Sequence, residues 1–260
     1  MKMIQANFAN SAKKILENDQ NVLGLAVAGS WLKNEIDEFS DLDLIVVTKE
    51  KIGGNRDKML AYAKRFNGFL SGFTGEHVGE PRLLICLYEE PLLHVDIKFL
   101  TMEECHSLVE TPIFLIDKNR ELEKIIIDSS PKYPYPDYQW IEDRFWIWIH
   151  YALLKIGRGE YFEAYDFLGY LRSMVLGPLL HIKNNTLPRG VRKVETELTD
   201  EDLSALKLTI AKYDRNSLLE GLQNVVLLYR KLRIKLFNQE VAFNLQTENK
   251  VMEYFHKLTY

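Results

Sequence analysis

A proline-rich segment at residues 129–136 limits most strongly what this chain can fold into. It reads Ser-Ser-Pro-Lys-Tyr-Pro-Tyr-Pro. Because proline fixes φ and lacks a backbone N–H donor, neither a helix nor a central strand can run through this segment. Before it, strand-like and helical patterns are mixed, whereas beyond it the helical spacing continues almost to the end of the chain. The sequence therefore predicts two domains, residues 1–130 and 137–260.

The first domain is predicted to be an α/β (α+β) domain with a mixed sheet. Its expected strands are residues 23–28, 43–47, 82–88 and 92–99, and its expected helices are residues 4–18, a short one from Ser30, and 56–67. The last two strands are joined by Glu-Glu-Pro, which is typical of a hairpin-like connection. We expect strand 92–99 to pair antiparallel with strand 43–47.

The second domain is predicted to be an all-α helical bundle. Its expected helices are residues 138–156, 160–183, 199–213 and 215–238. Gly177-Pro178 should kink or end the second of these helices, because proline interrupts the helical hydrogen bonds.

One motif in the first domain points to chemistry. Gly29-Ser30 is followed by Asp41-Leu42-Asp43 and an apolar strand. The glycine lets backbone approach a ligand closely, and Ser30 can cap the helix after it and leave N–H groups for an anion. Side chains alternate along a strand, so Asp41 and Asp43 project from one face. Two carboxylates in this arrangement can share divalent cations with substrate phosphates.

A third carboxylate is expected on a neighbouring strand. Asp96 lies in Leu-Leu-His-Val-Asp-Ile-Lys-Phe-Leu, and His94 and Lys98 share its face. Either could contact a phosphate or the acceptor, but we favour a partly buried histidine and a strand-edge lysine without such a role. An isolated Asp-x-Asp is usually a turn or a solvated strand end, but the glycine turn, the apolar strand and Asp96 together indicate a functional site.

These residues resemble the nucleotidyltransferase superfamily of DNA polymerase β, in the small bacterial branch of aminoglycoside and lincosamide nucleotidyltransferases. The resemblance implies a Mg²⁺-dependent enzyme that transfers a nucleoside monophosphate, with AMP as the first candidate, from a nucleoside triphosphate to a hydroxyl of a small molecule. An aminoglycoside-like antibiotic is one such acceptor. The resemblance further implies that Asp41, Asp43 and Asp96 hold two Mg²⁺ ions, that Gly29 and Ser30 contact the β- and γ-phosphates of the triphosphate, presumed to be ATP, and that Asp96 helps to deprotonate the acceptor.

The second domain resembles aminoglycoside nucleotidyltransferases around Lys155, in Lys-Ile-Gly-Arg-Gly-Glu. The resemblance implies that Lys155 reaches the triphosphate, where a cation would clamp the phosphates. The residues alone allow an equal alternative, because basic side chains at a helix C-terminus suit the helix dipole without any ligand.

Some charged residues are weaker candidates. Arg144 and His150 show the Arg-x5-His spacing also found in HEPN-type ribonucleases, which we interpret as coincidence. The acidic residues that could bind an amine-bearing acceptor, each more often a solvated surface charge, are Glu76, Glu80, Glu142 and Asp143.

Composition narrows the remaining classes. The net charge of -4 and the lack of a basic tail argue against nucleic acid as a partner. The two cysteines are expected to be buried free thiols in a reducing compartment. The N-terminal residues show no signal-peptide core and no stretch reaches the length of a membrane span, so we expect a cytoplasmic protein without a membrane partner.

Two alternatives remain open. One is a protein nucleotidyltransferase that adds AMP to a partner protein, although such members usually lack a fused bundle. The other is a non-catalytic nucleotide-binding interaction module, which three carboxylates disfavour because like charges are costly without metal. The acceptor, the base preference and a homodimeric state are left open by the sequence.

Overall fold

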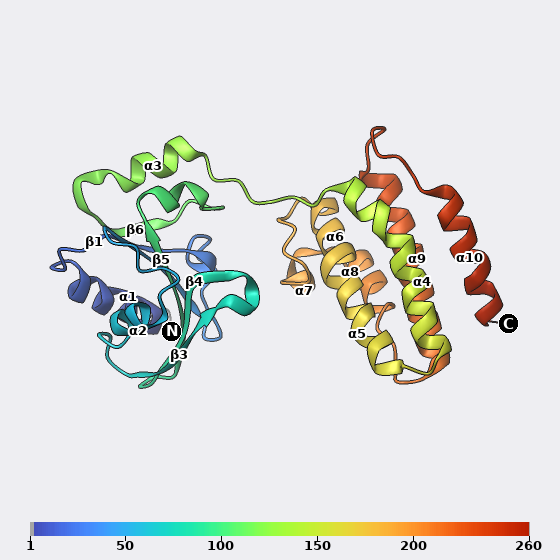
Figure 1. Cartoon of the computed structure of the whole chain (residues 1–260), viewed down its shortest axis with the longest axis horizontal. Helices are drawn as coiled ribbons and strands as arrows, with labels where there is room; N and C mark the ends of the chain where they lie inside the picture. The colour runs from blue at the N-terminus through green and yellow to red at the C-terminus, as the bar shows by residue number, and fades with distance from the viewer. Residues whose placement is uncertain (1–2, 260) are drawn as a thin grey trace. The chain divides into compact units, whose positions relative to one another are not determined.

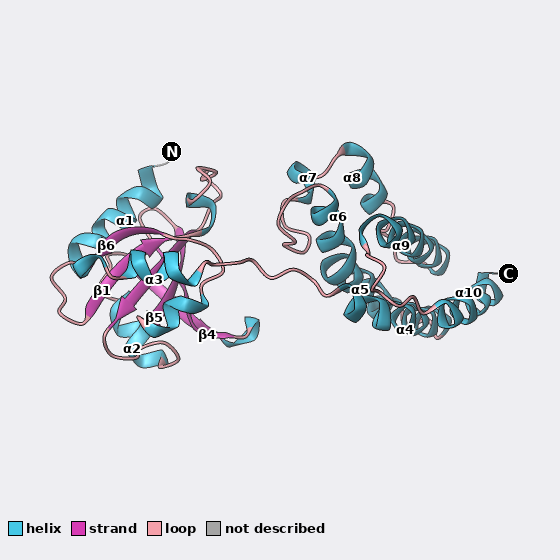
Figure 2. Ribbon diagram, turned by 90° about the horizontal axis from the view of Figure 1, so that it is seen from above, coloured by secondary structure: helices cyan, strands magenta, loops and turns pink. Residues whose placement is uncertain are grey.

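The structure, a computed structural model describing residues 3–259, separates into two compact units (Figure 1). The boundary falls between Tyr133 and Pro134, inside the proline-rich segment. All strands lie in the first unit, and the second is helical (Figure 2). The predicted fold class, a mixed-sheet domain followed by an all-α bundle, is confirmed. We keep residues 1–130 and 137–260 as proposed domain limits, whose outer ends, residues 1 and 260, lie outside the described residues.

The first unit contains a sheet with the strand order β3-β4-β5-β2-β1-β6. The strands are β1 (Val22–Val27), β2 (Leu42–Thr48), β3 (Phe69–Gly75), β4 (Glu80–Tyr88), β5 (Leu93–Thr101) and β6 (Ile113–Asp117). Neighbouring strands pair antiparallel except β2 and β5, which run parallel.

The predicted antiparallel pairing of β5 with β2 is therefore wrong. After β2 the chain passes through helix α2 (Arg56–Ala63) before β3, and two antiparallel reversals, β3 to β4 and β4 to β5, follow. Two reversals restore the direction of β3, so β5 runs as β3 does. The helical crossover between β2 and β3 gives β3 the same direction as β2, so β5 is also parallel to β2. Strand β3, which the sequence analysis missed, is the element that changes the outcome.

Each face of the sheet carries its own core. Helices α1 (Met3–Leu16) and α2 pack on the face that bears Leu42, Leu44 and Val46. Helix α3 (Leu122–Ser129) and the 3₁₀ turn Glu103–Ser107 pack on the opposite face, against Ile45 and Val47. By strand alternation Asp43 belongs to this second face, one step before Ile45.

The second unit is built from helices whose lengths range from four residues (α7) to twenty-two (α9). They are α4 (Tyr138–Gly157), α5 (Tyr161–Leu171), α6 (Gly177–Lys183), α7 (Val194–Glu197), α8 (Asp200–Lys207), α9 (Arg215–Leu236) and α10 (Leu245–Thr259). Their buried faces form one core that includes Phe145, Trp146 and Tyr229.

The expected interruption at Gly177-Pro178 takes the form of a π-helical segment, Arg172–Leu176, directly before it. Proline 178 has no N–H to bond within the helix, and the wider π turn accommodates its ring. Gly177 also passes so close to Gly190 that an added Cβ would lie 2.2 Å from the Gly190 carbonyl oxygen. The chain thus needs both residues for this crossing.

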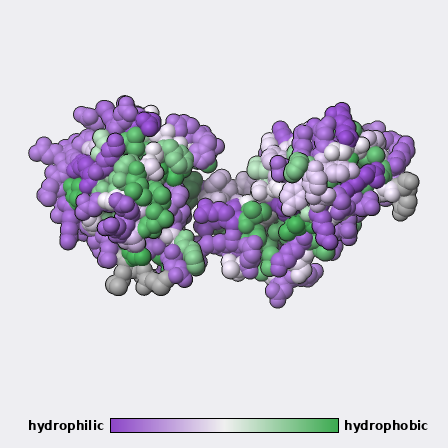
Figure 3. All heavy atoms as spheres, turned by 90° about the horizontal axis from the view of Figure 1, so that it is seen from below, coloured by the Kyte–Doolittle hydropathy of each residue, from purple (hydrophilic) through white to green (hydrophobic). Residues whose placement is uncertain are grey.

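The face drawn in Figure 3 is largely hydrophilic and carries hydrophobic patches. Phe162 and Ile234 of the bundle are 74% and 77% exposed. Within residues 3–259 no helix combines the length and the apolar character that crossing a bilayer requires.

Candidate active site

The central feature of the first unit is a pair of carboxylates on neighbouring strands. Asp43 of β2 and Asp96 of β5 are direct partners in the parallel ladder. Register partners on adjacent strands have side chains on the same face, about 5 Å apart. Both residues are half-buried. The structure therefore brings together two acids separated by more than fifty residues of sequence.

The turn after β1 lies against this pair. Gly29 has a φ of 62°, and a Cβ added to it would lie 1.9 Å from Oδ2 of Asp43. The preceding Ala28 N–H donates to the backbone oxygen of Asp43 at 3.1 Å. Only glycine fits here, because the backbone conformation is left-handed and the carboxylate occupies the space of a side chain.

The short helix expected from Ser30 is a single 3₁₀ turn, Gly29–Trp31. Its N-cap residue is Ala28, and no side-chain hydrogen bond caps it, so the predicted capping by Ser30 is wrong. Ser30 is the second residue of this turn, directly after Gly29. A capping residue must precede the first turn of its helix, and here that position belongs to Ala28.

Asp41 ends the loop that leads into β2, two residues before Asp43, and is half-buried. A buried glutamine fixes this loop. Gln5 of α1, only 3% exposed, donates from Nε2 to the backbone oxygens of Asp37 at 3.1 Å and Ser40 at 2.9 Å. Helix α1 thus sets the path of the chain immediately before the Asp-x-Asp pair, a role that the sequence analysis missed.

A fourth acid, Glu110, also lies at the site, and no sequence pattern indicated it. The Gly29 N–H donates to Oε1 of Glu110 at 3.0 Å. Glu110 lies in the segment between the turn Glu103–Ser107 and β6, where residues have no periodicity to read. Its position depends on the pairing of β1 with β6, in which Val27 faces Ile113. Because β6 was not predicted, the contact between Glu110 and Gly29 could not be predicted either.

The two neighbours of Asp96 on its own strand have different partners. His94, with a side chain 51% exposed, lies with Nε2 2.9 Å from Oδ1 of Asp96. Lys98 forms an ion pair with Glu80 at 2.8 Å, and Arg82 binds the same carboxylate at 2.7 Å. The hydrogen bonds from Arg82 and Lys98 lower the pKa of Glu80 to about 2, against the cost of burial. His94 is thus an exposed residue that also contacts Asp96, and it is not the partly buried histidine that was favoured.

The donor set suits magnesium. Asp41, Asp43 and Asp96 offer carboxylate oxygens, the hard ligands that this ion prefers. Glycine at position 29 lets the turn pack directly against the Asp43 carboxylate. Across residues 3–259, no three or more His, Cys, Asp or Glu side chains are already gathered as a metal-binding group.

Lys155 lies near the end of α4, where two carboxylates surround it. Its Nζ is 2.8 Å from Glu160 and 3.0 Å from Glu163, and its side chain is 15% exposed. The hydrogen bonds to Glu160 and then Glu163 raise the pKa of Lys155. A contact with a triphosphate stays a prediction, and it requires Lys155 to exchange these partners.

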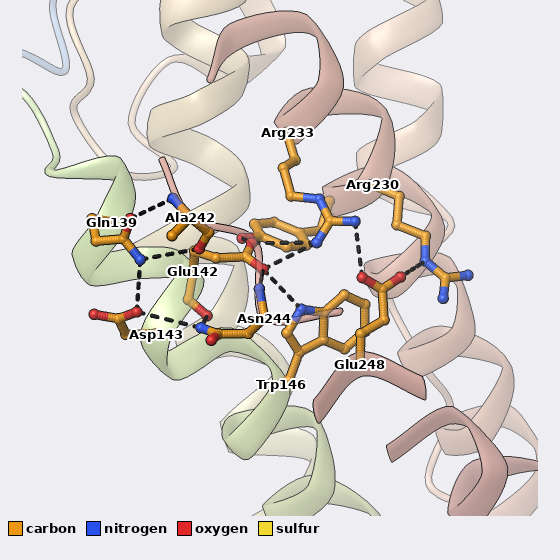
Figure 4. A network of polar contacts seen from close by, with 10 residues as sticks. Gln139, Glu142, Asp143, Trp146, Arg230, Arg233, Ala242, Asn244 and Glu248 are labelled. Carbon is orange, nitrogen blue, oxygen red and sulfur yellow. Dashed lines mark hydrogen bonds and ion pairs between the residues drawn. The ribbon is translucent and has the colours of Figure 1, made fainter. Parts of the chain in front are cut away.

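One candidate for acceptor binding is corrected by the structure. Glu142 of α4 is fully buried, and Figure 4 shows it in a polar network among helices and the loop before α10. It accepts hydrogen bonds from Tyr229 at 2.5 Å, from Arg233 at 3.1 Å and from the Asn244 N–H at 3.0 Å. Trp146 also donates to it at 3.3 Å. Glu142 therefore stabilises the bundle and cannot reach a ligand.

The other weak candidates also have protein partners. Asp143 accepts from Gln139 at 2.8 Å, and Glu76 accepts from Thr74. The Arg144 guanidinium lies 4.3 Å from the Trp140 ring centre, and His150 packs against Tyr254. Both cysteines are buried and free, as expected, and burial raises the pKa of Cys86 to about 12 and that of Cys105 to about 11.

Solved structures of two adenyltransferases and of a nucleotidyltransferase-like protein align with most of this chain at low sequence identity. An aminoglycoside 6-adenyltransferase from Bacillus subtilis aligns over 98% of this chain and 97% of its own, with 15% identity and a TM-score of 0.41. A nucleotidyltransferase-like protein from Exiguobacterium sibiricum 255-15 aligns over 96% of this chain and 89% of its own, with 11% identity and a TM-score of 0.37. The spectinomycin adenyltransferase AAD(9) from Enterococcus faecialis, solved with ATP and spectinomycin, aligns over 98% and 99%, with 13% identity and a TM-score of 0.32.

No protein-family model matches the sequence. No curated protein matches it either. The function of this chain is therefore inferred from its own residues.

Proposed function

We propose that this protein is a Mg²⁺-dependent nucleotidyltransferase that moves a nucleoside monophosphate, AMP first, from a nucleoside triphosphate to a hydroxyl of a small molecule. The observation that supports this most is the pairing of Asp43 with Asp96, with Gly29 packed against Asp43. Two half-buried carboxylates side by side repel each other, which costs stability unless cations bind between them. Such a site is suited to a metal-bound polyphosphate.

Asp41, Asp43 and Asp96 would hold two Mg²⁺ ions, which when bound neutralise the phosphates and favour departure of pyrophosphate. The acceptor hydroxyl oxygen forms a bond to the α-phosphorus as the bond from this phosphorus to the bridging oxygen breaks. Pyrophosphate leaves with the electron pair of that bond. The hydroxyl proton passes to the carboxylate of Asp96.

Gly29 and Ser30 contribute binding rather than proton transfer. A backbone without a side chain at position 29 allows a phosphate to approach the turn closely. Lys155 is proposed as an additional phosphate ligand, released from Glu160 and Glu163 when the anion arrives. An aminoglycoside-like antibiotic is one acceptor that this chemistry would serve.

Nucleotide binding tests the proposal directly. We would measure the melting temperature of the full chain with ATP, GTP, CTP and UTP, with and without Mg²⁺, and repeat this with Asp43→Asn. Stabilisation that needs both Mg²⁺ and Asp43 is expected. Nucleotide binding that ignores the metal and the substitution would refute the enzyme and favour a non-catalytic binding module.

A screen for the acceptor follows from the same chemistry. Pyrophosphate release would be measured against aminoglycosides, lincosamides and fractions of cell metabolites, using the nucleotide that stabilises the protein most. Release that requires one added compound identifies the acceptor. Transfer of labelled AMP to protein in place of a small molecule would instead support the protein nucleotidyltransferase.

A further inference from the structure

The contact between Glu110 and Gly29 has a role in the cycle of the proposed enzyme. We propose that Glu110 is an internal competitor of the nucleotide: its carboxylate occupies the Gly29 N–H that a phosphate oxygen takes when the triphosphate binds. This inference rests on the proposed function of the Gly29 turn. It adds a residue that controls how tightly the anion is held.

The geometry of the turn supports this assignment. The Gly29 N–H already binds an anion, because Oε1 of Glu110 accepts from it at 3.0 Å. A single N–H lying along one direction supports one short, well-aligned acceptor. A phosphate oxygen and the Glu110 carboxylate therefore cannot both take this donor in full.

The charges around Gly29 favour exchange. On its other side, Gly29 touches the carboxylate of Asp43, whose Oδ2 lies where a Cβ would be. Glu110 and Asp43 thus both contact Gly29, and Asp96 lies beside Asp43 on the neighbouring strand. Like charges at this spacing disfavour one another in a partly buried site. When a metal-bound triphosphate arrives, expulsion of Glu110 relieves part of this repulsion.

The segment that carries Glu110 lies outside the sheet and the helices, so a change of the Glu110 side chain breaks no strand pairing. Residues 108–112 have no helical or strand assignment, and regular structure begins at Ile113, paired with Val27. On the other side, the 3₁₀ turn Glu103–Ser107 is fixed by the buried Cys105. The side chain can leave Gly29 by local rotation while both anchors stay in place.

The test compares binding of MgATP and of inorganic triphosphate to the full chain by calorimetry. Glu110→Ala frees the donor, and we expect both ligands to bind about tenfold more tightly, the scale of one charge-assisted hydrogen bond. Glu110→Gln keeps an acceptor without charge, so an intermediate affinity is expected. Glu103→Gln, a nearby exposed acid, is the matched control and should bind as the wild type does.

The amide resonance of Gly29 gives a second readout. It should shift in Glu110→Ala without ligand, and in the wild type on addition of triphosphate. Equal or weaker binding by Glu110→Ala would refute the proposal that Glu110 competes with the nucleotide. The proposed function would still stand if the wild type binds MgATP. Failure of wild type and Glu110→Ala alike to bind either ligand would overturn both.

Discussion

Glu142 in the bundle and Asp43 in the sheet unit are acids in opposite situations. Glu142 is fully buried and accepts hydrogen bonds from Arg233, Tyr229 and a backbone N–H. Asp43 is half-buried, lies against the glycine turn and has a second carboxylate as its ladder partner. An acid enclosed by donors and a guanidinium stabilises the fold it belongs to. Two acids side by side disfavour one another, and a bound cation would relieve that cost.

The electrostatic neighbours explain the contrast further. Arg233 also bonds Glu248 at 2.9 Å, and Arg230 bonds Glu248 at 2.7 Å, so the bundle network balances its charges within itself (Figure 4). Burial raises the pKa of Tyr229, which keeps its hydroxyl protonated as a donor to Glu142. At the sheet site, His94 is the partner of Asp96 at 2.9 Å, and it is half exposed to solvent.

The largest effect is expected from Asp43→Asn. Removing this charge should lower pyrophosphate release about 10³-fold, since loss of a group that stabilises transition-state charge costs on this order. The melting temperature should stay unchanged or rise, because repulsion with Asp96 is relieved. Steady-state kinetics with the identified acceptor and thermal unfolding would measure the two effects.

Asp57→Asn is the control for this substitution, since the Asp57 side chain is 92% exposed on α2. It should leave activity and melting temperature as they are. If Asp43→Asn unfolded the protein instead, Asp43 would belong with Glu142 as a structural acid.

Glu142→Ala is expected to lower stability, whereas Asp43→Asn is expected to lower activity. It removes one of the two carboxylates bonded to the buried Arg233 and leaves the buried Tyr229 hydroxyl and the Asn244 N–H without their acceptor. The free energy of unfolding of the bundle should fall by about 3–5 kcal/mol. Urea unfolding followed by tryptophan fluorescence would measure this, because Trp146 donates to Glu142. The exposed pair of Lys250 and Glu253 gives the control, and Glu253→Gln should change stability by less than about 1 kcal/mol. A loss of similar size in both variants would contradict the buried network.

Gly29→Ala separates backbone strain from damage to the site. A Cβ here would collide with Asp43, so we expect pyrophosphate release to fall about 100-fold, since small displacements of catalytic groups cost on this order. Gly54→Ala is matched to it, because Gly54 also has a positive φ, 85°, but nothing lies within 4 Å of its added Cβ. Both variants should lose about 1 kcal/mol of stability, and only Gly29→Ala should lose activity. Equal activities would remove Gly29 from the site.

The smallest effect concerns the ion pairs of Glu80. Its pKa in the folded protein, about 2, lies below its ordinary value of 4.5. The pairing therefore stabilises the fold above pH 4.5, and this contribution is lost as the pH falls from 4.5 through 2. Solvent screening limits it to about 1–2 kcal/mol. Urea unfolding should show Glu80→Gln less stable than the wild type at pH 6, with the difference shrinking towards pH 2.5; a constant difference would show that the charge does not matter.

Much of the fold could be predicted from local pattern. Strand β4 was expected at residues 82–88 and is Glu80–Tyr88, and helix α4 was expected at 138–156 and is Tyr138–Gly157. Strands β3 and β6 were missed. The β3 sequence Phe-Leu-Ser-Gly-Phe-Thr-Gly carries two glycines, which weaken the strand signal, and β6 is only five residues long.

The candidate site was predicted in part for the same reason. Asp41, Asp43 and Gly29 lie in one short stretch, where spacing and alternation can be read directly. The parallel direction of β5 and the approach of Glu110 depend on β3 and β6, so they followed from elements that local pattern did not show. Glu142 was misjudged because nothing in its helix indicates which face Arg233, ninety-one residues later, will cover.

The sequence by itself determined that Asp41 and Asp43 lie two residues apart, that a glycine turn precedes them, and that a proline-rich segment separates a mixed-sheet part from helices. These follow from bonded geometry and side-chain periodicity, which act over a few residues. Only the tertiary structure decided that Asp96 is the ladder partner of Asp43, that Glu110 holds the Gly29 N–H and that Glu142 is enclosed. Those outcomes come from pairing and packing between distant segments, where the free energy depends on which surfaces meet and not on the residues next in the chain.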